Sequence, residues 1–479
     1  MLFNSLNFAI FLPIVYFFYW FLLSKKIKNQ NILLLIASYF FYSCWDWRFL
    51  FLLIFSTLLD YFTGIKMSDT LRVERKKMWF WISIVINLGF LGVFKYYNFF
   101  SNSFSELLLN FGLKVSVTTL DIVLPVGISF YTFHGLSYVI DIYKGRIKAE
   151  RNLIDYSLFV SFFPLLVAGP IERATHLLPQ LKMKKIFNRE KTIDGFRQIL
   201  WGLFKKIVIA DQCAEYANLI FNNSAEYSGS TLLLGAVFFS FQIYGDFSGY
   251  SDIALGTARL FGIELLKNFS FPYFSRDIAE FWRRWHISLS TWFRDYVYIP
   301  LGGSSGFLKV KIRNTFVIFI LSGFWHGANW TFIVWGILNA LYFLPLMLLK
   351  KNRVNKEIVA HDRLLPNVKE MFQILFTFFM TTLAWVFFRS ENLTQAISFI
   401  FNIFNKSLFL KPVISPVYLY ILIGFFICVE WIQRKKNHGL EFNSSNNKYL
   451  IFRWLFYFLL AFLIFILNGK KENFIYFQF

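Results

Sequence analysis

Apolar stretches close to the length of one bilayer crossing recur along this chain from end to end. They cover residues 8–23, 31–42, 49–65, 79–94, 121–141, 153–168, 230–244, 315–348, 371–388, 416–431 and 450–467. Of the 479 residues, 57% are hydrophobic, whereas a soluble domain is nearer to about 45–50% apolar. A helix needs about 20 mainly apolar residues to cross the hydrocarbon core, so the sequence predicts an all-α, polytopic membrane protein with about 11 transmembrane helices.

The chain is strongly basic, with 49 Lys and Arg against 28 Asp and Glu and a formal net charge of +21. The basic residues gather in short runs between apolar stretches, such as "SKKIKN", "RVERKK" and "KKNRVNK". This placement is typical of cytoplasmic loops, so we expect membrane lipid and no nucleic acid as the partner. Basic loops could also attract an anionic donor, and composition does not separate the two. The first stretch, followed by "SKKIKN" without a small-residue cleavage site, is predicted to be an uncleaved span ending in the cytoplasm.

No soluble domain and no repeat of fixed period is evident, so we expect a single membrane domain over residues 1–479 with a terminal tail at 469–479. Residues 241–330 form its polar centre, because charge, glycine and proline interrupt the apolar character there. Each charge at the bilayer centre would cost about 2.5–3.5 kcal/mol. Charged or irregular backbone survives at that depth only under a cover of protein or along an aqueous cavity. Residues 241–303 are therefore predicted to be re-entrant or interfacial structure inside a ring of helices.

His326 is the strongest candidate for a functional side chain. It lies in "SGFWHGANWTF", between two apolar runs. If this stretch is one helix, residues at spacings of three and four share its face, namely Ser322, Gly323, Asn329 and Trp330. Gly323 and Gly327 form a G-x-x-x-G, which allows the close approach of a helix or of a substrate. His286 lies forty positions earlier in an arginine-rich segment, and a helix-loop return could bring the two histidines together. A buried structural histidine is the alternative.

The remaining histidines, carboxylates and cysteines give weaker signals. His134 is expected to be a structural, hydrogen-bonded histidine, and His176 to be either structural or near an acceptor. His361 and His438 lie in charged loops and are expected to be solvated. Asp246 and Asp252 in "YGDFSGYSD" have no histidine or third carboxylate beside them, so we expect no metal and interpret Asp246 as an anchor for backbone or hydroxyl donors. The three cysteines lie far apart, which indicates neither a disulfide framework nor a thiolate zinc site.

Several stretches resemble the membrane-bound O-acyltransferases, in particular the bacterial branch of alginate O-acetylases and peptidoglycan O-acetyltransferases. They are "LPVGISFYTFHGLSYVIDIYKG" (124–145), "FFPLLVAGPIER" (162–173), "DFSGYSDIALG" (246–256), "FWRRWHISLSTWFRDYVYIPLGG" (281–303), "WHGANWTFIVWG" (325–336) and "FIYFQF" (474–479). The resemblance covers nearly the whole chain, and its two histidine motifs are the specific part. It departs at His134, where an amide such as Gln is expected. The implied fold has re-entrant segments around a central tunnel.

The resemblance also implies a reaction. Cytosolic acetyl-CoA is the expected donor substrate, with no bound cofactor, and the family's catalytic histidine and its polar partner map to His326 and His286. A neutral imidazole is available as a base near pH 7, and a leaving thiol with a pKa of about 8.5 needs little acid help. Asn329, Trp330 or His286 could donate to the tetrahedral intermediate.

Three arginines are candidates for the donor's phosphates, because guanidinium groups pair well with phosphate. They are Arg283, Arg284 and Arg294. The alternative is that they pair only with Asp295, Glu280 and backbone carbonyls, and the sequence leaves both open.

The C-terminal tail resembles a motif of related extracellular acylation systems whose tyrosine is thought to accept the acyl group. By this resemblance the role maps to Tyr476. An aryl ester is more activated than a sugar ester, because a phenol with a pKa of about 10 is the better leaving group. Such a relay would move the acyl group outward without moving the donor. The alternative is an aromatic tail anchored at the membrane interface.

The expected function is therefore O-acetyl transfer toward an extracytoplasmic polysaccharide, carried out in the bacterial inner membrane. A separate periplasmic or surface transferase of the SGNH type is the expected partner. One alternative is a transporter or flippase for a lipid-linked glycan, although such proteins usually show inverted repeats. The other is a family member that acylates a lipid or a protein.

Overall fold

The computed structural model describes residues 1–114, 119–120, 123–167, 169–442, 450–469, 472 and 474–475. Helices form the regular structure in these ranges, and no strand occurs within them. The prediction of an all-α protein is confirmed. The chain folds into two compact units, the first made of Met1–Asn188 and Ala258–Leu266, the second of Arg189–Thr257 and Lys267–Phe479.

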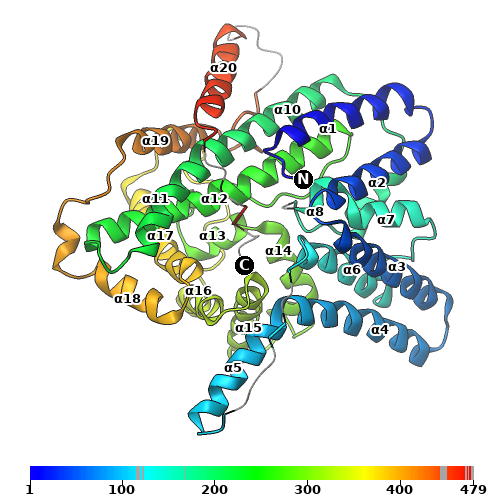
Figure 1. The fold of residues 1–479 in the computed structure, drawn as a ribbon, viewed down its shortest axis with the longest axis horizontal. Helices are drawn as coiled ribbons and strands as arrows, with labels where there is room; N and C mark the ends of the chain where they lie inside the picture. Colours follow the sequence, from blue (N-terminus) through cyan, green and yellow to red (C-terminus); the bar gives the residue numbers. More distant parts are fainter. Residues whose placement is uncertain are drawn as a thin grey trace. The chain divides into compact units, whose positions relative to one another are not determined.

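The first unit holds nine α-helices in its described residues (Figure 1). They are α1 (Leu6–Phe17), α2 (Ile27–Ser43), α3 (Trp47–Asp69), α4 (Val73–Leu91), α5 (Tyr97–Asn110), α6 (Ile128–Tyr143), α7 (Leu153–Ser161), α8 (Phe163–Leu166) and α9 (Ala174–Lys182). Short π-helical segments extend two of them, η1 (Phe18–Leu22) after α1 and η2 (Gly92–Tyr96) between α4 and α5.

The second unit contains both candidate histidines. Its helices are α10 (Arg189–Leu203), α11 (Asp211–Asn222), α12 (Gly229–Leu260), α13 (Ile278–Arg284), α14 (Ile287–Phe293), α15 (Leu308–His326), α16 (Trp330–Leu348), α17 (Val368–Arg389), α18 (Leu393–Ile403), α19 (Val417–Ile432) and α20 (Leu450–Ile466). Two π-helical segments, η3 (Phe204–Ala210) and η5 (Arg294–Tyr298), and two 3₁₀ turns, η4 (Pro272–Phe274) and η6 (Lys406–Phe409), complete it. The last three residues of α12 belong to the first unit.

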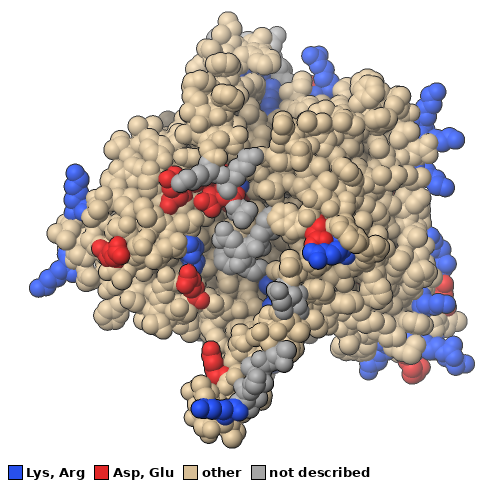
Figure 2. Space-filling view, in the orientation of Figure 1, with Lys and Arg blue, Asp and Glu red and all other residues tan. Residues whose placement is uncertain are grey.

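The apolar character of the sequence is carried by helices long enough to cross a bilayer. In the described residues, five helical stretches are long and apolar enough to cross a membrane. They are Trp47–Asp69, Val73–Asn110, Gly229–Leu260, Trp330–Leu348 and Val368–Arg389. Five shorter apolar helices accompany them. Uncharged side chains make up most of the face shown in Figure 2. The membrane character is confirmed, and the number of about 11 crossings stays a prediction.

The polar centre is only partly irregular. Residues 241–256 were expected to break, but α12 runs through them without interruption, and that expectation is wrong. The reason is that its carboxylates are neutralised: Asp246 Oδ1 lies 2.9 Å from Lys206 Nζ, and Asp252 Oδ2 lies 2.5 Å from Lys205 Nζ. Residues 261–303 do consist of short helical pieces and turns, as predicted.

The two lysines lie on η3, which joins α10 to α11. Both side chains are buried. A π-helical insertion widens one turn of a helix, and such insertions are frequent at functional sites. Here it presents two adjacent lysines to the carboxylates of a neighbouring helix.

Helices α15 and α16 are in close backbone contact where glycine occupies their interface. A Cβ added at Gly323 would lie 2.2 Å from the carbonyl oxygen of Phe332, and one at Gly336 would lie 2.4 Å from that of Phe319. Only glycine allows this approach, so the expectation that small residues let a helix come close to His326 is confirmed.

We expect Gly336→Ala to lower the midpoint of thermal unfolding in detergent, because the two backbones must separate to admit the methyl group. Overpacking of this kind costs about 1–3 kcal/mol. Gly424→Ala on α19 is the matched control, since nothing lies within 4 Å of a Cβ at that position. Equal midpoints for the two variants would contradict the close contact.

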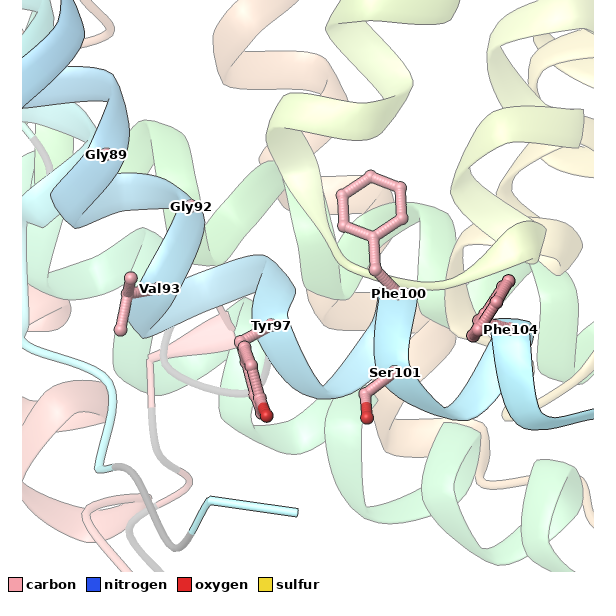
Figure 3. A pocket seen from close by; sticks show the side chains of 7 residues that line it. All are labelled: Gly89, Gly92, Val93, Tyr97, Phe100, Ser101 and Phe104. Atoms are coloured by element: carbon pink, nitrogen blue, oxygen red, sulfur yellow. The ribbon is translucent and has the colours of Figure 1, made fainter. Parts of the chain in front are cut away.

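A shallow hollow runs along one side of α4, η2 and α5 in the first unit (Figure 3). It is lined by Gly89, Gly92, Val93, Tyr97, Phe100, Ser101 and Phe104. Its lining has no carboxylate, histidine or basic side chain, so it lacks a base that is available near pH 7 for acyl transfer.

Candidate active site

His286 occupies a strained turn between α13 and α14. Its backbone is left-handed, with φ 42° and ψ 54°, a conformation that costs a non-glycine residue about 1–3 kcal/mol. Asn268 stabilises this turn through two hydrogen bonds. Its carbonyl oxygen accepts one from Ile287 N at 2.8 Å, and its side-chain oxygen accepts one from Ser288 Oγ at 2.6 Å. The Asn268 amide in turn donates to Ser251 Oγ at 2.9 Å. Strain that the surroundings hold in place is common where a side chain must point in one direction.

The His286 imidazole lies in an aromatic environment. Its ring meets the ring of Phe247 edge-on, with centroids 4.7 Å apart, and lies 5.8 Å from that of Trp325. Among the described residues, neither ring nitrogen has a hydrogen-bond partner. Burial lowers the pKa of His286 to about 3, so the imidazole is neutral at pH 7. It therefore has one N–H to donate and one nitrogen to accept.

His326 is the last residue of α15 and is 3% exposed. Its ring lies edge-on to Trp335 of α16 and Phe388 of α17, with centroids 5.2 Å apart in both cases. The rings of His326 and His286 have their centroids 6.3 Å apart. The structure thus brings together two histidines that are forty positions apart in the sequence, as the sequence analysis proposed, and both belong to the second unit.

Asn329 and Trp330 do not share a helix face with His326, and that prediction is wrong. Helix α15 ends at His326, because Gly327 is extended (φ −161°, ψ 154°) and a Cβ there would lie 2.1 Å from the ring of Phe332. Asn329 is instead the N-cap of α16: its Oδ1 accepts from Thr331 N at 3.0 Å, and its Nδ2 donates to the carbonyl of Glu391 at 2.8 Å. Their proposed roles as donors remain predictions.

The three candidate arginines are held by protein partners. Arg283 donates to the backbone carbonyls of Asn352 and Asn355 at 2.9 and 2.6 Å. Arg284 donates to Glu280 Oε1 at 2.8 Å and to the carbonyl of Ser270 at 3.2 Å.

Arg294 pairs with its neighbour Asp295 at 2.7 Å, and its side chain is 60% exposed. All three arginines therefore make the kind of pairs that the second interpretation named, and contact with donor phosphates stays a prediction.

Asp246 accepts from both a side chain and a backbone amide. Its Oδ2 accepts a hydrogen bond from Ile475 N at 2.7 Å, while Oδ1 faces Lys206 Nζ. Anchoring of backbone donors was the expected role. No group of three or more His, Cys, Asp or Glu side chains suited to a metal occurs in the part of the chain that the structure describes.

Three residues at this centre escaped the sequence analysis: Asn268, Lys205 and Lys206. The lysines were detectable, because "WGLFKKIVIA" places two adjacent charges inside an apolar stretch. Asn268 carries no such signal. Tyr476 lies outside the described residues, as do all residues after Ile475.

Of the other four histidines, three lie in the environment that was predicted and one, His438, does not. His134 is buried and its Nε2 accepts from Glu172 N at 3.0 Å, while His176 Nδ1 lies 2.8 Å from Glu172 Oε2, so both have structural contacts in the first unit. His361 is exposed, as predicted. The prediction that His438 is solvated is wrong. Its side chain is buried, because its Nε2 pairs with Oδ1 of Asp194 on α10 at 3.1 Å.

Comparison with known proteins gives consistent relatives. The model of the membrane-bound O-acyltransferase family matches residues 146–387. The probable alginate O-acetylase AlgI of Pseudomonas aeruginosa is 40% identical over 398 residues, which cover 83% of this chain and 73% of that protein. The peptidoglycan O-acetyltransferase of Helicobacter pylori is 36% identical over 427 residues, or 83% of this chain and 78% of that protein.

A more distant relative is the teichoic acid D-alanyltransferase of Streptococcus thermophilus, 33% identical over 249 residues that cover 48% of this chain and 59% of that protein. The family match and the long relatives show that this chain belongs to the membrane-bound O-acyltransferase family. It is an acyltransferase and a membrane protein.

Proposed function

We propose that this chain transfers an acetyl group from cytosolic acetyl-CoA toward a polysaccharide on the far side of the membrane. The observation that carries the proposal is the pair of buried imidazoles, 6.3 Å apart, in a chain of this family. The names of its relatives support an acetyl group and a glycan acceptor: one is a probable alginate O-acetylase and another a peptidoglycan O-acetyltransferase.

In the proposed reaction, His326 is the general base. It takes the proton of an acceptor hydroxyl, the hydroxyl oxygen bonds to the acetyl carbon, and the carbon–sulfur bond to CoA breaks. The proton then passes to the leaving thiolate. His286, neutral because of its lowered pKa, donates its N–H to the carbonyl oxygen on which negative charge develops. Such donors are worth several kcal/mol in a dry site, where they need no reorganisation.

The donor would enter from the cytosolic side through the tunnel that the family resemblance implies. Of the three candidate arginines, Arg294 is best suited to the phosphates of CoA. Its side chain is 60% exposed, whereas that of Arg284 is 11% exposed, and Arg283, although exposed, donates to two backbone carbonyls. The transfer would take place in a bacterial inner membrane, and a periplasmic or surface partner of the SGNH type would complete it. In this way the acetyl group reaches a polysaccharide that acetyl-CoA itself never contacts.

The test of the proposal is turnover of the donor by the purified protein. Acetyl-CoA labelled in the acetyl group is added in detergent together with a hydroxyl acceptor, and release of the CoA thiol and transfer of label to that acceptor are both followed. The proposal predicts both signals. A protein that moves a lipid-linked glycan would leave the thioester intact, and thiol release no faster than in the absence of protein would refute acetyl transfer.

We expect Tyr476→Phe to abolish acetylation on the far side of the membrane, because phenylalanine has no hydroxyl to carry the acetyl group. Tyr420→Phe is the matched control, since it removes a tyrosine hydroxyl that bonds only with Ser415 in the described residues. The measurement is the acetyl content of the exported polysaccharide in cells carrying each variant. Normal acetylation with Tyr476→Phe would end the relay hypothesis and leave donor turnover untouched.

A further inference from the structure

We propose that the buried Lys206–Asp246 pair is a docking site for the backbone of the C-terminal segment at Glu472 and Ile475. The docking itself is independent of the proposed function; its catalytic consequence rests on that function, because the residue after Ile475 is Tyr476.

Lys206 and Asp246 contact each other, and each also contacts the backbone of the C-terminal segment. Lys206 Nζ lies 2.9 Å from Asp246 Oδ1 and 2.7 Å from Asp211 Oδ1, and it donates to the carbonyl oxygen of Glu472 at 3.1 Å. Asp246 Oδ2 accepts from Ile475 N at 2.7 Å. The ammonium thus has three oxygen atoms within 3.1 Å, and each oxygen of the Asp246 carboxylate has one close partner, Oδ1 through the ion pair with Lys206 and Oδ2 through the hydrogen bond from Ile475.

A buried ion pair is stable only when its remaining donors and acceptors are satisfied. Lys206 and Asp246 are 1% and 2% exposed, so without the segment each would keep an unsatisfied polar atom, and an unpaired buried polar atom destabilises the folded state. Their contacts with the segment go to backbone atoms. These contacts hold the backbone at Glu472 and at Ile475.

Helix α12 links this dock to His286. Asp246 and Tyr250 are four residues apart and share a face, and the ring of Phe474 packs on that of Tyr250 with centroids 4.5 Å apart. Phe247, the residue after Asp246, lies 6.3 Å from Phe474 and 4.7 Å from His286 between ring centroids. One turn of α12 therefore contacts the segment on one side and the candidate site on the other.

The adjacent pair provides a matched control. Lys205 lies next to Lys206 on η3 and is equally buried, but its Nζ pairs with Asp252 at 2.5 Å, and Asp252 also accepts from Gln198 at 2.8 Å. Removing Lys205 and Asp252 together deletes a neighbouring Lys–Asp ion pair with side chains 4% and 14% exposed, on the same two helices, without removing the described contacts of the segment.

The experiment measures hydrogen exchange of the C-terminal peptide in the full-length protein. The double variant Lys206→Met/Asp246→Leu is compared with Lys205→Met/Asp252→Leu and with the unaltered chain. We expect exchange in the peptide containing Glu472 and Ile475 to become at least about tenfold faster in the first variant alone, because the Ile475 amide loses its acceptor and the Glu472 carbonyl loses its donor. Unchanged protection in that variant, or equal loss in both, would overturn the dock.

A second variant covers the case in which the double variant does not fold. Ile475→Pro removes the N–H that Asp246 accepts and leaves the buried pair intact. It is expected to accelerate exchange in the rest of the peptide and to lower acetyl transfer. If exchange accelerates but Tyr476→Phe leaves acetylation normal, the dock stands and the relay fails; if exchange is unchanged in Ile475→Pro, the dock fails.

Discussion

Replacing His326 with alanine is expected to lower the rate of acetyl transfer by about 10³-fold, because a positioned general base contributes about 10²–10⁴-fold. The Michaelis constant for acetyl-CoA should change little, since the imidazole acts on the acceptor hydroxyl. The measurement is the rate of CoA thiol release in the presence of acceptor, over a range of donor concentrations.

The control for this variant is His361→Ala, which removes an imidazole that is 54% exposed in a loop. It should retain the rate of the unaltered protein. Because His326 contacts three aromatic rings, its variant also needs an unfolding midpoint near that of the parent. A folded His326→Ala protein with normal turnover would remove this side chain from the mechanism.

Replacement of His286 is expected to lower the rate by about 10²-fold or more, the usual effect of losing one donor to a developing oxyanion. Two substitutions separate the side chain from the backbone. Asparagine tolerates the left-handed conformation of this position (φ 42°) and keeps an N–H donor, whereas alanine does neither. His286→Asn should therefore keep more activity than His286→Ala and show the higher unfolding midpoint.

Comparable rates for the two His286 variants, with both folded, would show that no donor is needed there. The pH dependence gives a second readout. With a pKa of about 3, His286 stays neutral between pH 5 and 9, so its variants should change the height of the pH–rate profile in that range and leave its midpoint in place.

The sequence was sufficient for the fold class and for the choice of histidines, for physical reasons. Apolar length predicts membrane helices because a bilayer imposes a thickness. An ionisable residue in an apolar run attracts attention because its burial is costly, and His326 and His286 both follow from that argument. Family resemblance then supplied the reaction that the composition could not.

The errors arose where tertiary contacts override local pattern. The ring of Phe332 occupies the space beside Gly327, and α15 ends at His326, three residues before Asn329, which was expected to share its face. Charges in 241–256 suggested broken backbone, yet α12 continues, because Lys205 and Lys206 neutralise its carboxylates from another helix. Pairings between residues forty or more positions apart leave no periodic signal in one sequence.

Asn268 illustrates what local pattern cannot reveal. It precedes α13 by ten positions, and nothing around it marks it, yet it carries the hydrogen bonds that hold the His286 turn. Its importance depends on the fold bringing residues 268, 251 and 288 together.

The most direct test of the account places the protein in sealed vesicles, with labelled acetyl-CoA on the side of the basic loops and a glycan acceptor together with the partner transferase on the other. Acetyl label is predicted to reach the acceptor with the parent protein while the CoA moiety stays outside, and with His326→Ala no label should cross above the background of empty vesicles. Transfer of label at the parental rate by His326→Ala would contradict the claim that this buried imidazole performs the acyl transfer.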